Sequence, residues 1–205
     1  MVNIHGRVMR KILILLIVIS FLPVSCREES WKQDMSDASR AVLDRVVGIY
    51  VIENMGWDGP EVDIDNDGVA GRDLMAQLPS VPFTGTREME AKADMQTGSG
   101  YAGVVRFRIC ADRTSSWSSY YWSDFGLNIY FDVLGGEFNP DMNNFYWGHD
   151  EVVFENPSLI LTDDDRLVLA ADTGVYDYMT GSVVYGRISW KFRCVSGKGK
   201  SDKNV

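Results

Sequence analysis

The sequence is poor in the residues and motifs on which most enzymes depend. Its 205 residues include only two histidines, and His149 is the one that lies beyond the first 25 residues. There is no G-x-S-x-G elbow, no H-E-x-x-H zinc motif, no C-x-x-C pair and no glycine-rich phosphate loop. We therefore predict that the protein is not an enzyme. A hydrolase that uses carboxylates is kept as the third and last alternative. It ranks last because no catalytic pair can be recognised among the 29 acidic residues.

Positive charge is also scarce. The chain has 20 Lys and Arg residues against 29 Asp and Glu residues, which gives a net charge of −9. Its only basic cluster lies near the C-terminus, where residues 197–205 are predicted to form a flexible basic tail. Because neutralised phosphates supply most of the affinity for nucleic acids, we do not expect a nucleic acid as a partner.

No apolar run is long enough to cross a bilayer as a helix. The longest, from Ile12 to Leu22, has 11 residues, whereas a spanning helix needs about 20. Arg10 and Lys11 precede it and "PVSC" follows it, which is the pattern of a signal peptide. We predict a signal peptide over residues 1–25.

The segment "LILLIVISFLPVSC" resembles the lipobox of bacterial lipoproteins. Ser25 fits that pattern, although Pro23 stands where leucine is usual. The resemblance implies that Cys26 is acylated and anchors the chain to a membrane, with residues 26–35 as a tether. The alternative is ordinary secretion with Cys26 as a thiol. The acidic "REES" after Cys26 resembles a tag that sends some Gram-negative lipoproteins to the outer face of the outer membrane, so we expect a surface-exposed protein, with a periplasm-facing one as the alternative.

The rest of the chain, residues 36–196, is predicted to be a single β domain. "SDASRAVLDRVVG" reads as a short N-terminal helix capped by Ser36 or Asp37. The segments after it alternate apolar and polar residues, most clearly in "VVRFRIC" and "RISWKFRC". Turns such as "TDDDR" indicate hairpins. About eight strands in an antiparallel meander are typical of a barrel or of a two-sheet β-sandwich.

The order of features resembles the lipocalin-like lipoproteins of Gram-negative bacteria. The specific part is a G-x-Y strand at Gly48 to Tyr50, followed by the loop "VDIDNDGVAGRDL". The resemblance implies a lipocalin-like barrel that binds a small or glycan ligand. A carbohydrate-binding sandwich that serves a glycan-uptake system is the alternative.

The loop also matches the first half of an EF-hand calcium site. Asp63, Asp65 and Asp67 fall at positions 1, 3 and 5, with glycine at 6 and the Val69 carbonyl at 7. The second half does not match, because the expected glutamate is missing and Asp73 comes one place early. We expect a structural calcium ion held by Asp63, Asp65, Asp67, Val69 and Asp73; the alternative is an Asx-rich turn without metal.

Two further groups of residues are singled out by their chemistry. Aromatic residues among serines suggest a sugar-binding loop, or else core packing; its predicted ligand-binding residues are Trp117, Tyr120, Tyr121 and Trp122. Cys110 and Cys194 both end predicted strands, so they either form a disulfide, if those strands are neighbours, or remain free thiols. No feature of the sequence indicates a protein partner.

Overall fold

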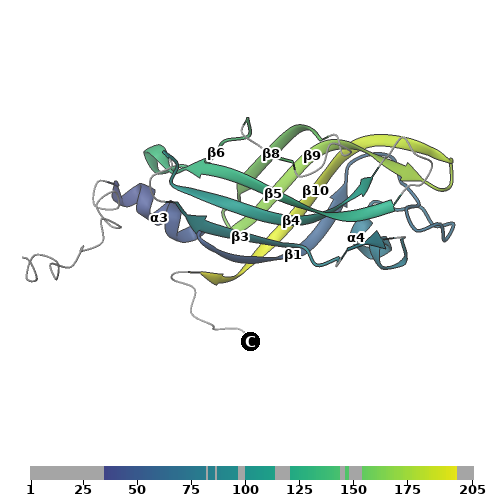
Figure 1. Ribbon diagram of the computed structural model, residues 1–205, viewed down its shortest axis with the longest axis horizontal. Coiled ribbons are helices and arrows are strands. Elements are labelled where there is room, and N and C mark those ends of the chain that lie inside the picture. The colour runs from purple at the N-terminus through teal and green to yellow at the C-terminus, as the bar shows by residue number, and fades with distance from the viewer. Residues whose placement is uncertain are drawn as a thin grey trace, which may run out of the picture. The chain divides into compact units, whose positions relative to one another are not determined.

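The computed structural model describes residues 35–81, 83–85, 87–96, 100–113, 121–143, 146–147 and 154–197. Strands dominate, with a few short helices between them (Figure 1). The elements are α3 (Asp37–Val46), β1 (Gly48–Trp57), α4 (Leu74–Gln77), η2 (Leu78–Ser80), β2 (Phe83–Thr84), β3 (Glu90–Met95), β4 (Gly103–Arg113), β5 (Tyr121–Asp132), η3 (Leu134–Gly136), β6 (Asn139–Pro140), β7 (Tyr146–Trp147), β8 (Glu155–Leu161), β9 (Arg166–Asp177) and β10 (Ser182–Gly197).

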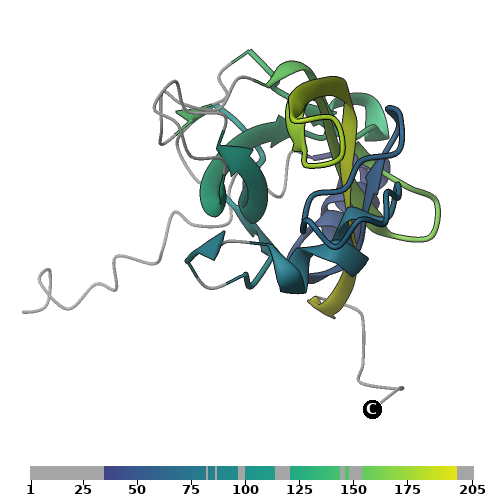
Figure 2. The ribbon, with the colours of Figure 1, turned by 90° about the vertical axis from the view of Figure 1, so that its right-hand side faces the viewer.

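The strands form one sheet that rolls into a nearly closed barrel. Its hydrogen-bonded order is β2-β5-β4-β3-β1-β10-β9-β8, and every pair except β2–β5 is antiparallel. The first long strand, β1, therefore pairs with the last, β10, and the meander runs outward from both. Figure 2 shows the barrel end-on, with β4 and β5 across from β9 and β10. The predicted antiparallel barrel is confirmed, and the sandwich alternative is not adopted.

Among the described residues the sheet ends at β2, beside β5, on one side and at β8 on the other. Three two-residue strands, β2, β6 and β7, pair with different stretches of β5. They occupy backbone donors and acceptors that an uncovered edge would leave exposed.

Large side chains fill the space that the described strands enclose. In β4, Val105, Phe107 and Ile109 are buried, while the arginines between them are exposed. The Phe107 ring lies 5.3 Å from that of Phe192 on β10, and Trp190 donates a hydrogen bond of 3.1 Å from its indole nitrogen to the Cys110 carbonyl. The predicted alternation is confirmed, and the interior is a packed core.

The predicted N-terminal helix is α3. The Ser36 hydroxyl caps it by accepting a hydrogen bond from the Ser39 amide at 3.1 Å. At the other end, the buried Tyr50 hydroxyl donates to the Val46 carbonyl at 2.6 Å and lies 3.1 Å from the Arg45 carbonyl. The Arg45 side chain in turn reaches the β8–β9 turn, where it bonds Asp165 at 2.7 Å. The C-terminal end of the helix is thus tied to β1 and to the β8–β9 turn.

Cys110 and Cys194 are free thiols, which corrects the disulfide alternative. Cys110 belongs to β4 and Cys194 to β10, and these strands are separated in the sheet by β3 and β1. The condition for pairing, that the two strands be neighbours, is therefore not met. Burial raises the pKa of the Cys110 thiol to about 12, which suits an inert core residue.

None of the helices in the described ranges combines the length and the apolar character that crossing a bilayer requires.

Candidate functional sites: an acidic loop and a surface groove

The acidic loop is closed by a small bridge between its ends. Val62 and Gly71 exchange two backbone hydrogen bonds, of 3.1 and 2.9 Å. Within the loop, the Asp63 carboxylate accepts hydrogen bonds from the amides of Asn66, Asp67 and Gly68, at 2.7, 3.3 and 3.0 Å. The chain therefore turns around one buried carboxylate.

This turn brings the first three predicted metal ligands together. Carboxylate oxygens of Asp63, Asp65 and Asp67 all lie within 4.8 Å of one another, so the group could hold a metal ion. One oxygen of Asp65 is buried, and within the described part of the chain it has no hydrogen-bond partner. Burial, followed by the charge of Asp67, raises the pKa of Asp65. Hard oxygen donors that repel one another in this way suit a cation such as calcium.

The Val69 amide donates to the Asp67 carboxylate at 2.7 Å, a bond that does not involve the carbonyl oxygen predicted as a ligand. Asp73, the last of the predicted ligands, has a different role. Asp73 caps α4, where its carboxylate accepts a hydrogen bond from the Ala76 amide at 3.2 Å, and it is not part of the acidic group formed by described residues. The second half of the loop, where the sequence departs from the EF-hand motif, thus contributes Asp73 to a helix cap and not to the acidic group.

Two residues that the motif does not contain hold the loop in place. Gln77 accepts a hydrogen bond from the Ile64 amide at 2.8 Å and donates one to the Val62 carbonyl at 3.1 Å. Asp177, at the end of β9, accepts a hydrogen bond from the Asp63 amide at 2.9 Å. Because Asp177 lies 114 residues further along the chain, no local sequence signal could have identified it.

The aromatic loop that we predicted to bind sugar falls largely outside the described residues. Trp117 and Tyr120 belong to the segment 114–120, and of Tyr121 only the backbone, in β5, is described. Trp122 is a correction to the predicted set. It is only 3% exposed, so it packs in the core and cannot present its ring to a ligand.

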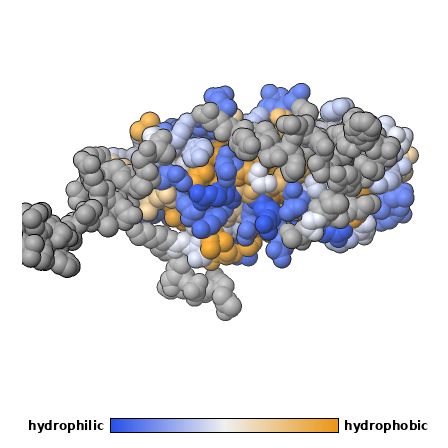
Figure 3. All heavy atoms as spheres, viewed as in Figure 1, coloured by the Kyte–Doolittle hydropathy of each residue, from blue (hydrophilic) through white to orange (hydrophobic). Residues whose placement is uncertain are grey.

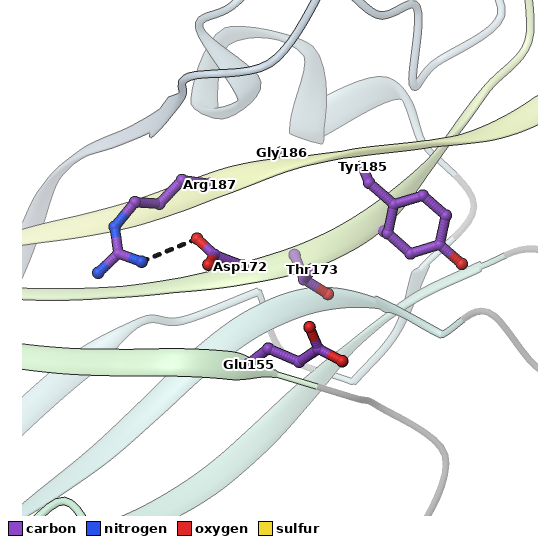
Figure 4. A pocket seen from close by; sticks show the side chains of 7 residues that line it. Glu155, Asp172, Thr173, Tyr185, Gly186 and Arg187 are labelled. Carbon is purple, nitrogen blue, oxygen red and sulfur yellow. Dashed lines mark hydrogen bonds and ion pairs between the residues drawn. The ribbon is translucent and has the colours of Figure 1, made fainter.

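A groove of about 420 Å³ opens on the outer side of the barrel, near the point where β8 begins (Figure 4). β8 pairs with β9 only as far as Glu155 opposite Asp172, so the remainder of β9 has no β8 partner. The groove lies over this step between the strands. Its lining includes Glu155, Asp172, Thr173, Tyr185, Gly186 and Arg187.

One wall of the groove is a network of charged and polar groups. Arg187 donates to the Asp172 carboxylate at 2.8 Å, to the Asn156 carbonyl at 3.1 Å and to the Ser158 hydroxyl at 2.7 Å. The Asn156 side chain donates to the other Asp172 oxygen at 2.8 Å. The hydrogen bond from Asn156, followed by that from Arg187, lowers the pKa of Asp172 and keeps this carboxylate ionised.

The other wall is an exposed aromatic ring. Tyr185 is 78% exposed, the highest value among the large hydrophobic side chains that the structure describes as exposed. It lies opposite Gly174 on β9, and a Cβ atom added to Gly174 would lie 3.2 Å from the Tyr185 ring. The Val183 side chain lies closer still, with its Cγ1 atom 2.6 Å from the same position, so the Tyr185 ring and Val183 together surround Gly174. Figure 4 shows the ring projecting on the side of the groove away from Arg187.

Exposed apolar side chains are otherwise scattered. On the face seen in Figure 3, hydrophobic residues lie between hydrophilic ones. Tyr185 stands out because it is aromatic and lies beside a hollow. The sequence did carry a signal for it, because Ile188, Trp190 and Phe192 point inward from β10, and Tyr185 therefore has the parity of an outward position.

The chain matches no family model, and no similarity to a curated protein or to a solved structure was detected. Its function therefore has to be argued from the two sites themselves.

Proposed function

We propose that the protein is a lipid-anchored binding protein of the cell envelope, which takes a small or glycan ligand in the groove beside Tyr185. The observation that carries this proposal is an exposed aromatic ring beside a hollow, next to a set of hydrogen-bonded polar groups. The apolar face of a sugar ring stacks on an aromatic side chain, while hydroxyl groups bind carboxylates and amides. The volume of about 420 Å³ falls within the range of small-molecule sites.

The groove is better suited to binding than to hydrolysis. A glycosidase needs one carboxyl group whose raised pKa keeps it protonated as a general acid. Asp172 has a lowered pKa, and both of its oxygens accept hydrogen bonds. It therefore orients Arg187 and is not available for proton transfer.

Calorimetric titration with a panel of oligosaccharides tests the binding site. We expect at least one of them to bind, and Tyr185→Ala to weaken that binding by about two- to twelvefold, since stacking on one ring contributes roughly 0.5 to 1.5 kcal/mol. Leu134→Ala is the matched control, because Leu134 is similarly exposed at 74% and lies outside the groove. If no oligosaccharide binds, or if Tyr185→Ala has no effect, the proposed site is wrong.

We also propose that calcium binds Asp63, Asp65 and Asp67 as a structural ion. The buried, unpartnered oxygen of Asp65 supports this, since a bound cation would neutralise it. Calcium should raise the melting temperature relative to chelator, and Asp65→Ala should abolish the rise. Asp163→Ala, in the exposed β8–β9 turn, should leave the rise intact. If the wild-type protein melts at the same temperature in calcium and in chelator, the calcium proposal is wrong and the loop is an Asx-rich turn without metal.

The anchor is proposed from the lipobox resemblance alone, and Cys26 lies outside the described residues. Expression in a Gram-negative host with radiolabelled palmitate should label the wild-type chain and leave Cys26→Ser unlabelled. Cys194→Ser is the control and should label normally. Surface exposure would appear as cleavage of the protein on intact cells by added protease, whereas complete protection would favour the periplasm-facing alternative.

A further inference from the structure

The charges along the groove form a row across three strands. Glu155 on β8 pairs with Asp172 on β9, and Asp172 pairs with Arg187 on β10. The row therefore contains two carboxylates and one guanidinium. Like charges directly opposite each other on neighbouring strands are unfavourable, so Glu155 adds a negative charge that the fold itself does not require.

The single positive charge of the row is already engaged. The Arg187 guanidinium is held by Asp172, by the Asn156 carbonyl and by the Ser158 hydroxyl. The ion pair with Asp172 compensates its charge, so the groove offers an anionic ligand little attraction. A uronic acid or a phosphate would also face repulsion from the neighbouring Glu155.

The remaining charge is available to a ligand. Glu155 is exposed, and its carboxylate takes part in none of the hydrogen bonds or ion pairs formed by the described residues. Figure 4 shows this carboxylate pointing from β8 toward Thr173, inside the groove. The open face of Tyr185 lies along the same hollow, and aromatic faces attract cations. A free carboxylate and an exposed ring favour the same kind of ligand group.

We propose that the groove selects a ligand with a protonated amine, in particular a sugar whose amino group is not acetylated. The ammonium group binds the Glu155 carboxylate, and the apolar face of the same sugar lies on the Tyr185 ring. This inference rests on the proposed glycan-binding function and specifies the chemical class of the ligand.

The test compares three β-1,4-linked trisaccharides, built from glucosamine, N-acetylglucosamine or glucose, by calorimetric titration of the full-length protein at pH 6 and low salt. The glucosamine trisaccharide should bind about fivefold more tightly than the other two, as expected for one partly exposed charge interaction of about 1 kcal/mol. Raising the sodium chloride concentration to about 0.5 M should reduce this preference, because salt screens exposed charges.

Two variants assign the preference to Glu155. Glu155→Gln should reduce binding of the glucosamine trisaccharide to the level of the glucose trisaccharide. Glu137→Gln, which removes an exposed carboxylate outside the groove, should change nothing. Equal affinities for the three trisaccharides, or a preference that survives Glu155→Gln in a protein with an unchanged melting temperature, would overturn the amine inference and leave glycan binding intact. If none of the three binds, the amine inference fails, while the glycan function is decided separately by the oligosaccharide panel described above.

Discussion

Asp177 at the end of β9 and Asp112 near the end of β4 are two buried carboxylates in very different surroundings. Their exposed fractions are 3% and 4%. Asp177 accepts four hydrogen bonds, from the amides of Asp63, Met179 and Thr180 and from the Thr180 hydroxyl. Asp112 accepts a single one, of 2.7 Å from the Tyr176 amide, and its other oxygen has no partner among the described residues.

The pKa values of the two groups move in opposite directions. Burial alone would raise the pKa of Asp177, but its hydrogen bonds outweigh this effect and lower the pKa. Burial raises the pKa of Asp112 to about 7, because one hydrogen bond from Tyr176 does not compensate for lost hydration. The larger number of donors around Asp177 and the deeper position of Asp112 below the surface therefore act together in deciding which charged form is tolerated.

The donors differ because of what the chain does next to each residue. After Asp177 the chain turns, and the amides of Met179 and Thr180 point back at the carboxylate. Asp112 instead lies opposite the buried Trp122 and reaches across to the part of β9 that β8 does not cover. A turn supplies several amides at once, whereas β9 beyond its described pairing with β8 supplies Asp112 with one, from Tyr176.

Removal of Asp177 should have the largest effect on stability. Asp177→Ala leaves the amides of Asp63, Met179 and Thr180 without their acceptor, so we expect a loss of about 5 kcal/mol in the free energy of unfolding. Urea denaturation at pH 7 measures it. Asp163→Ala, on an exposed turn, is the control and should change the free energy by less than about 0.5 kcal/mol. Similar losses for both variants would show that the hydrogen bonds to Asp177 contribute little.

The buried charge of Asp112 should make stability depend on pH. Its pKa rises from 3.8 to about 7 on folding, so the folded state binds the extra proton in this interval. The group's contribution is fully present below pH 4 and is lost as the pH rises to about 7, a change of up to about 4 kcal/mol.

Asp112→Asn should remove this dependence. Urea denaturation from pH 4 to pH 8 measures the unfolding free energies of both proteins. As the pH rises, the wild-type protein should lose stability relative to the Asp112→Asn variant. A constant difference over the whole interval would mean that Asp112 does not titrate there. This experiment most directly separates Asp112 from Asp177, whose lowered pKa gives the opposite slope, at acid pH.

Tyr50 extends the comparison to a buried hydroxyl group that is hydrogen-bonded. Its hydroxyl donates to carbonyls at the end of α3, so Tyr50→Phe removes a donor from carbonyl groups that remain in place. We expect a loss of about 2 kcal/mol in urea denaturation. Tyr185→Phe on the exposed surface should cost less than about 0.5 kcal/mol, and an equal cost for both would argue against the helix contact.

Thr180 gives the smallest expected effect. Thr180→Val removes one of the four hydrogen bonds to Asp177 and should cost about 1 kcal/mol. Thr180→Ser keeps the hydroxyl and should retain most of the wild-type stability. If the two variants are equally stable, three hydrogen bonds already satisfy Asp177.

Local patterns in the sequence predicted much of the fold. The alternation of Phe107 and its neighbours placed β4, and Ser36 marked the start of α3, because both signals depend only on residues close together in the chain. The every-second-residue spacing of Asp63, Asp65 and Asp67 likewise predicted their clustering. In each case one turn or one strand was enough to fix the geometry.

The rest depends on contacts between distant segments. Asp112 meets Tyr176 across 64 residues, and Asp177 meets Asp63 across 114. The groove brings together residues of three strands, with Glu155 opposite Asp172 and Asp172 opposite Arg187. This arrangement follows from strand register and not from composition. Trp122 was predicted to lie in a binding loop, whereas it belongs to β5 and is buried. Its burial depends on how β5 packs, which the local sequence does not show.

The tie between α3 and the barrel has a mechanical consequence. The chain enters the domain through α3 and continues at once into β1, which is hydrogen-bonded on one side to β3 and on the other to β10. A force applied to the N-terminal side of the domain would first meet Tyr50 and the Arg45–Asp165 contact. Further pulling along β1 would load two rows of hydrogen bonds in shear, so that they must break together and not one after another. Tension along β1 from that end would therefore be opposed by several contacts at once.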